Sequence, residues 1–115
     1  MLVNYKSYVC SKLGKVDSLR IECFNRTKLK RGHVRVRIYA IGLNYVDYLM
    51  IKGNYQYKNN LPFIPGTEAS GIIIEENCNN RKLINKRVII NSKSGCFSEE
   101  ISLSFKEIIL IDKRN

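Results

Sequence analysis

Short stretches in which apolar and polar residues alternate dominate the chain. The clearest of them covers residues 34–40, where Val34, Val36 and Ile38 alternate with arginines. Alternation with a period of two predicts a strand that buries one face and wets the other. Residues 18–23 show the same pattern, and polar or glycine-containing turns separate these segments. The predicted strands span residues 2–10, 18–23, 34–40, 69–76, 87–91, 97–104 and 107–111.

One short helix is predicted among the strands. Asn44 is a favourable N-cap, and Asp47 stands at the third helical position, where a carboxylate can bond back to the amide of the cap. Gly53 suits the left-handed residue that closes a helix. A polar loop over 54–60 follows, and then residues 61–66, whose two prolines hold the backbone extended. Many short strands with one helix predict a mainly β domain, either a small barrel or a sandwich.

The size and composition fit one ordinary folded domain. The 115 residues suffice for a single core, and we assign residues 1–115 to one domain. Apolar residues make up 44% and charged residues 26%, which excludes the low hydrophobicity of disordered chains. No stretch approaches the ~20 apolar residues that a membrane helix needs, and the first residues do not resemble a secretion signal. We therefore expect a cytoplasmic location and no membrane partner.

The charge is strongly basic and uneven. The formal net charge is +10, and residues 1–58 hold twelve Lys/Arg against three acids. Such an excess can mark a surface for nucleic acid or an anionic membrane. The sequence shows neither a recognition helix nor an RNA-binding signature, so binding to nucleic acid is a weaker alternative and is not predicted.

The cysteines do not form a metal-binding pattern. Cys10, Cys23, Cys78 and Cys96 are widely separated, no C-x-x-C pair occurs, and His33 is the one histidine of the chain. Structural zinc sites need closely spaced thiolates and imidazoles. We therefore expect buried free thiols and no metal.

Three consecutive motifs give the sequence a family resemblance. They are Ala-Ile-Gly-Leu-Asn-Tyr-Val-Asp at 40–47, Lys-Gly-Asn-Tyr at 52–55 and Leu-Pro-Phe-Ile-Pro-Gly-Thr-Glu-Ala-Ser-Gly at 61–71. In order and spacing they resemble the zinc-independent quinone oxidoreductases of the medium-chain dehydrogenase/reductase superfamily. The segments at 32–37 and 95–100 extend the resemblance. It implies a mainly β, GroES-like, partly open barrel with one or two short helices.

The resemblance also assigns roles to four residues. Zinc-dependent relatives have a cysteine at the place of Asn44 and a histidine at the place of Thr67, so the resemblance implies no zinc. It implies instead that NADPH passes a hydride to a quinone-like acceptor, with the protein supplying orientation. By this analogy Asn44 and Asp47 line the cleft near the nicotinamide, Tyr55 covers it, and Thr67 takes the place of the metal ligand. Asn44 and Tyr55 would contact the cofactor.

Residue types alone leave structural roles open for the same side chains. Asn44 and Asp47 can cap the helix, Tyr55 can pack on Pro62, and Thr67 can be a turn hydroxyl. Glu68 is expected to form a hydrogen bond or an ion pair with a nearby arginine. Under these alternatives the four side chains stabilise the helix start, the loop and the turn, and they do not form a catalytic or cofactor-binding site.

Two turns lack the glycines that the family pattern has. The first covers residues 76–80 and the second begins at Asn85. Losing a glycine costs about 1 kcal/mol where the turn needs a positive φ, although asparagine tolerates that region best.

The resemblance implies a second domain with a glycine-rich turn for the cofactor pyrophosphate, and residues 1–115 contain no such turn. Our first hypothesis is the catalytic-domain half of an NADPH-dependent quinone oxidoreductase. It would be inactive alone and NADPH would not bind it alone. The chain would be either a half that works with a separate Rossmann-domain chain or the remnant of a split gene. The alternative is a non-enzymatic module that keeps the barrel and uses its exposed interface to bind itself or another protein.

Overall fold

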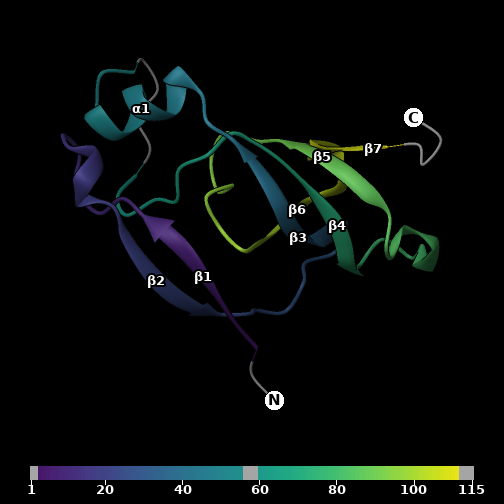
Figure 1. The fold of residues 1–115 in the computed structure, drawn as a ribbon. Coiled ribbons are helices and arrows are strands. Elements are labelled where there is room, and N and C mark those ends of the chain that lie inside the picture. Colours follow the sequence, from purple (N-terminus) through teal and green to yellow (C-terminus); the bar gives the residue numbers. More distant parts are fainter. Residues whose placement is uncertain (1–2, 56–59, 112–115) are drawn as a thin grey trace.

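Two antiparallel sheets make up the fold (Figure 1). The computed structural model describes residues 3–55 and 60–111. The elements in chain order are β1 (Asn4–Val9), the 3-10 helix η1 (Val16–Ser18), β2 (Arg20–Asn25), β3 (His33–Gly42), α1 (Tyr45–Lys52), β4 (Glu68–Glu76), η2 (Arg81–Leu83), β5 (Arg87–Asn91), β6 (Glu100–Ser104), η3 (Phe105–Glu107) and β7 (Ile108–Leu110). The predicted mainly β fold with one short helix is confirmed. Residue 2 of the first predicted strand and residues 56–59 of the predicted loop lie outside the described residues.

The two sheets are joined but not closed into a barrel. β1 pairs with β2, while the larger sheet has the order β6-β3-β4-β5-β7. The segment 97–99 connects them, because the amide of Tyr8 donates to the carbonyl of Phe97 and that of Glu99 donates to Lys6, each at 2.9 Å. Cys10 and Phe63 exchange two further backbone hydrogen bonds of 2.8 and 3.0 Å. The result is the partly open, GroES-like barrel that the family resemblance implied.

The core consists of two apolar clusters. The larger lies on one face of the five-stranded sheet and the smaller lies beneath α1. Val34 and Val36 are fully buried in the larger cluster and Ile38 packs against it, as the alternation predicted. The buried members of the larger cluster are Val34, Val36, Ala69, Ile73, Leu83, Val88, Ile90, Cys96 and Leu103. Those of the smaller cluster are Cys10, Met50, Ile51 and Phe63.

β2 differs from its prediction. Every residue of this strand except Phe24 is exposed, including Ile21 at 59% and Cys23. The expected dry face is absent because, among the described elements, β2 contacts mainly its pairing partner β1. All four cysteines are free, but only Cys10 and Cys96 are the buried thiols that we predicted.

Two further differences concern short segments. The three 3-10 helices have too few residues for a hydrophobic period, so no pattern predicted them. The last long strand begins at Glu100 and not at Phe97, because residues 97–99 turn away to pair with β1.

Asparagine replaces glycine in two turns with left-handed backbone. Asn79 has φ 55° and Asn85 has φ 71°. These are the turns from which the family's glycines are missing, and asparagine is the residue that tolerates this region best after glycine.

The helix boundaries are also confirmed, since α1 starts after Asn44 and ends before Gly53, which has φ 82°.

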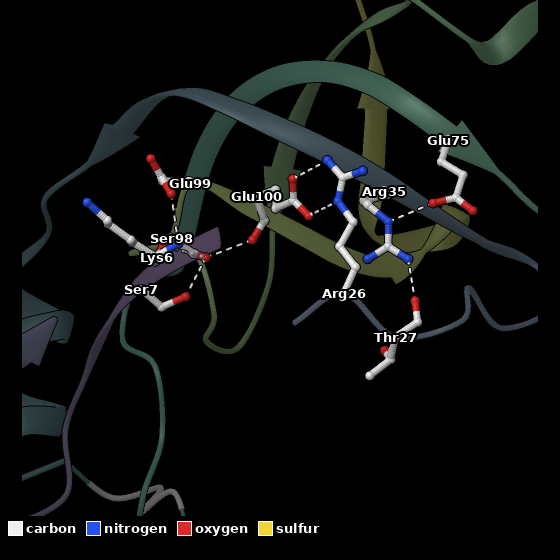
Figure 2. Close-up of polar contacts among 9 residues, drawn as sticks. All are labelled: Lys6, Ser7, Arg26, Thr27, Arg35, Glu75, Ser98, Glu99 and Glu100. Carbon is white, nitrogen blue, oxygen red and sulfur yellow. Dashed lines mark hydrogen bonds and ion pairs between the residues drawn. The ribbon is translucent and has the colours of Figure 1, made fainter. Parts of the chain in front are cut away.

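Two arginines with part-buried hydrogen bonds attach the loop before β3 to the large sheet (Figure 2). Arg26 forms two bonds to the carboxylate of Glu100, one of them 2.6 Å from Nη2 to Oε2. Arg35, only 4% exposed, donates to Glu75 at 2.7 Å and to the carbonyl of Thr27 at 2.6 Å. The alternation had predicted Arg35 on the wet face, but these partners let it be buried.

Candidate functional site

The start of α1 and the start of β4 lie at the same end of the large sheet. In the β3–β4 ladder Gly42 stands opposite Glu68. Asn44 follows Gly42 by two residues, and Thr67 directly precedes Glu68, so the ladder brings the two side chains to one place. Both are half-buried. The structure thereby unites two of the predicted site residues from motifs that are separate in sequence.

Asp47 connects these two residues from beneath. Its side chain is only 3% exposed, and Oδ2 accepts a 2.9 Å hydrogen bond from the amide of Asn44. The side chain of Thr67 also hydrogen-bonds to this carboxylate. Within the described part of the chain, Oδ1 has no hydrogen-bond partner. Because Asp47 is buried, we interpret it as a residue that positions Asn44 and Thr67.

Burial raises the pKa of the Asp47 carboxyl above its ordinary value. Desolvation is the main cause, because a charge is costly in a medium of low dielectric constant. The negative charge of Glu68 raises it further, whereas the hydrogen bonds from Asn44 and Thr67 oppose the shift. The folded chain therefore binds this proton more tightly than the unfolded chain does.

The pKa shift predicts how Asp47→Asn will change stability with pH. A raised pKa in the folded state means that wild type loses stability as pH rises from the ordinary value of 3.8 through the folded pKa. Asparagine stays neutral and can still accept the bond from Asn44. Urea unfolding between about pH 3 and pH 7 should show the variant gaining on wild type as pH rises. A stability difference that is constant over this range would contradict the assignment.

Cys96 lies near the same carboxylates and is chemically quiet. Burial raises the pKa of its thiol to about 12, and the negative charges of Asp47, Glu107 and Glu68 contribute. A thiol with this pKa is protonated at neutral pH, so it is neither a nucleophile nor a ready metal ligand. Sequence reasoning had no signal for this neighbourhood, because Cys96 and Asp47 lie in different motifs.

No metal centre is evident in the described ranges. Among residues 3–55 and 60–111, no group of three or more His, Cys, Asp or Glu side chains could hold a metal ion. The places of the zinc ligands hold the amide of Asn44 and the hydroxyl of Thr67, which are poor zinc ligands. Independence from zinc stays a prediction.

Tyr55 packs on the smaller core cluster, to which Met50 and Ile51 of α1 also belong. It is half-buried against the smaller core cluster, which contains Cys10 and Phe63. This contact favours the packing role that residue types alone suggested. The expected contact was Pro62, and the cluster contains its neighbour in sequence, Phe63. Its predicted role as a cover over the cofactor is not tested by these contacts.

Glu68 does not find the arginine partner that we expected. Its side chain is exposed and forms no ion pair with any arginine of the described residues. It lies against the backbone of Gly42, where an added Cβ would be 3.3 Å from Oε2. The arginines that are paired contact Glu75, Glu76 and Glu100 instead.

Comparison with known proteins gives a consistent result. Residues 30–110 match the profile of the alcohol dehydrogenase GroES-like domain. Over 72 residues, 63% of this chain, the sequence is 41% identical to the quinone oxidoreductase-like protein 2 homolog of Nematostella vectensis. It is 29% identical over 110 residues, 93% of the chain, to the synaptic vesicle membrane protein VAT-1 homolog of Danio rerio. The matched regions are 20% and 22% of those proteins.

A solved structure is similar throughout. The chain superposes on a proposed NADPH:quinone reductase from Bacillus thuringiensis with a TM-score of 0.89 and 31% identity. The match covers 96% of this chain and 34% of that protein. The chain thus spans about a fifth of the curated relatives and about a third of the solved one.

Within the described residues, no helix is long and apolar enough to cross a bilayer.

Proposed function

The chain belongs to the family of alcohol dehydrogenase GroES-like domains, and from this premise we propose that it is the catalytic domain of an NADPH-dependent quinone oxidoreductase. The observation that supports this most directly is that Asn44, Asp47 and Thr67 lie together, beside the end of β3 and the start of β4. An amide and a hydroxyl stand where zinc-dependent relatives have a thiolate and an imidazole. Such groups orient a substrate by hydrogen bonding and do not need a metal.

These residues fit the reactive end of the cofactor. Asn44 and Thr67 are half-buried, so the side-chain amide of Asn44 and the hydroxyl of Thr67 can both offer hydrogen bonds to a bound ring. NADPH, when bound, supplies a hydride to the acceptor. Asp47 holds the other two residues in place, because its carboxylate accepts hydrogen bonds from the backbone amide of Asn44 and the side chain of Thr67.

The phosphate end of the cofactor needs further polypeptide. Residues 1–115 contain no G-x-G-x-x-G turn to hold a pyrophosphate. We propose that a Rossmann-type domain provides it, either as a separate chain or as another part of a longer protein. Residues 1–115 alone would then lack both the phosphate contacts and the benefit of holding two reactants together.

A hybrid protein tests this proposal. Residues 3–111 would replace the matching third of the Bacillus thuringiensis protein, whose fold is similar enough to accept the graft. We expect the hybrid to oxidise NADPH in the presence of a quinone, and the isolated chain to show less than ~1% of that rate. Asn44→Ala in the hybrid should lower kcat/KM by about 10-fold or more.

The matched control is Asn25→Ala, which removes an exposed asparagine at the end of β2. It should leave kcat/KM unchanged. Saturable NADPH binding by the isolated chain would overturn the requirement for a second domain. A folded hybrid that binds NADPH but reduces no quinone would overturn the proposed reaction.

A further inference from the structure

The two apolar clusters of the core are separate. The buried members of the smaller cluster are Cys10, Met50, Ile51 and Phe63, and those of the larger cluster come from β3, β4, η2, β5, β6 and Cys96. Among the described residues, none belongs to both clusters. The hydrophobic effect therefore stabilises this chain at two distinct places.

Backbone hydrogen bonds join the parts that surround the smaller cluster. The amide and carbonyl of Cys10, after β1, pair with those of Phe63 at 2.8 and 3.0 Å. The amide of Gly14, in the turn of the hairpin, donates to the carbonyl of Ile51 in α1 at 2.9 Å. We define the β1–β2 hairpin, η1, α1 and Phe63 as the smaller unit, and the five-stranded sheet with the larger cluster as the larger unit.

Polar contacts connect the two units. The amide of Tyr8 donates to the carbonyl of Phe97, and the hydroxyls of Ser7 and Ser98 share a buried bond of 2.6 Å. Figure 2 shows Ser7 and Ser98 at this boundary. A hollow of about 350 Å³ also lies there, with Phe63 on one side and Gly95 on the other. Because hydrogen bonds replace bonds to water, such contacts stabilise the boundary less than continuous apolar packing would.

The candidate site crosses this boundary. Asn44 and Asp47 belong to the start of α1 and hence to the smaller unit, whereas Thr67 directly precedes β4 in the larger unit. The bond from the amide of Asn44 to Asp47 lies within the smaller unit. The hydrogen bond between the side chains of Asp47 and Thr67 connects the two units.

We propose that the smaller unit opens from the larger unit while the five-stranded sheet stays folded, and that the Asp47–Thr67 hydrogen bond belongs to the closed state. An eight-residue helix and a two-stranded sheet are not stable alone in water, so the opened unit loses its structure. The larger unit keeps its own cluster. The candidate site is therefore complete only in the closed state.

Hydrogen exchange of the folded chain, followed by NMR at low urea concentrations, tests this proposal. The amides of Cys10 and Phe63 report on the smaller unit, and the amide of Ile73, which donates to the carbonyl of Lys86 at 3.0 Å, reports on the larger unit. After correction for intrinsic rates, we expect the first two amides to exchange at least ~10-fold faster than that of Ile73, because local opening releases them without global unfolding.

Two variants with the same chemical change separate the units. Ile51→Val removes one carbon from the smaller cluster, where Ile51 is 3% exposed, and Ile90→Val does so in the larger cluster, where Ile90 is fully buried. Ile51→Val should speed exchange at all three amides by about 3-fold or more, since the closed state is weakened relative to the open and the unfolded chain. Ile90→Val should speed exchange at Ile73 alone, because the open state keeps the larger cluster.

Thr67→Val tests the contact between the units. It leaves the buried carboxylate of Asp47 without one donor, so exchange at Cys10 and Phe63 should become about 3-fold faster or more. Thr27→Val is the matched control, because this threonine is exposed and only its backbone carbonyl accepts the bond from Arg35. It should leave these rates unchanged.

Three results would overturn the proposal. They are equal exchange of all three amides in the wild type, acceleration by Ile90→Val at Cys10 and Phe63 as large as at Ile73, and unchanged rates in Thr67→Val. The first two would show a single cooperative unit, and the third would remove the Asp47–Thr67 bond from the closed state. These measurements do not depend on whether the chain takes part in the proposed redox reaction.

Discussion

Replacing Gly71 with alanine is expected to prevent the chain from folding. Gly71 stands in β4 opposite Ile38, next to an irregularity in the β3–β4 register. A Cβ on Gly71 would overlap the carbonyl oxygen of Arg37 and would lie 2.8 Å from Cγ1 of Val36. The carbonyl belongs to the backbone of β3, so no side-chain rotation can relieve the overlap.

The expected cost is large because the clash separates two strands at the centre of the larger sheet. β3 and β4 carry much of the main core, including Val36 and Ile73, which are fully buried. We expect a loss of more than about 4 kcal/mol, which is a large share of the stability of a domain of this size. Circular dichroism and urea unfolding would measure it.

Gly32→Ala is the matched control for this substitution. Gly32 has a positive φ of 78°, but a Cβ there would meet no atom within 4 Å. It should cost about 1 kcal/mol through backbone strain alone. If Gly71→Ala unfolds at the same urea concentration as Gly32→Ala, the backbone of β4 does not approach the carbonyl of Arg37 as closely as described here.

Removing Glu100 should produce the second largest effect. Glu100 is 6% exposed and its carboxylate forms two bonds with Arg26, whose side chain is 26% exposed. Glu100→Ala leaves the guanidinium of Arg26 partly buried without its partner. We expect a loss of about 3 kcal/mol, because breaking one side of a buried pair costs more than the pair itself contributes.

Two comparisons separate this effect from the loss of any surface charge. Arg81 is 84% exposed and lies 3.7 Å from Glu76, so Arg81→Ala should leave the melting temperature unchanged. The double variant Arg26→Met with Glu100→Leu should recover part of the lost stability, because neither charge is then left unpaired. A Glu100→Ala variant that melts with wild type would show that the bidentate pair contributes little.

The local elements were predictable because their signals are local. Alternation placed β3, β4 and β5 within two residues of their observed ends, and Asn44 and Gly53 marked both ends of α1. Asn79 and Asn85, which have positive φ, lie in the two turns where the family pattern has glycines that this chain lacks. The dry face of β2 was mispredicted, since alternation indicates a strand but not what covers it.

The candidate site was only partly predictable. Asn44, Asp47 and Thr67 were identified from motif resemblance, yet their contact depends on Gly42 facing Glu68 in the β3–β4 ladder. Tyr55 belongs to the same set of motifs but packs on the smaller core cluster. The sequence contained no signal for the raised pKa of Cys96, since its cause is burial beside carboxylates from other segments.

The sequence by itself determined the fold class, the order of the elements, the boundaries of the helix and the resemblance to a family. The first three follow from hydrophobic period, capping and turn residues, which act over a few neighbours along the chain, and the resemblance follows from the motifs at 40–47, 52–55 and 61–71. The tertiary structure alone decided the partners of Arg26 and Arg35, the burial of Asp47 and the division of the core into two clusters. These features depend on register and on where strands end, and they join residues as distant as 26 and 100, which no local pattern connects.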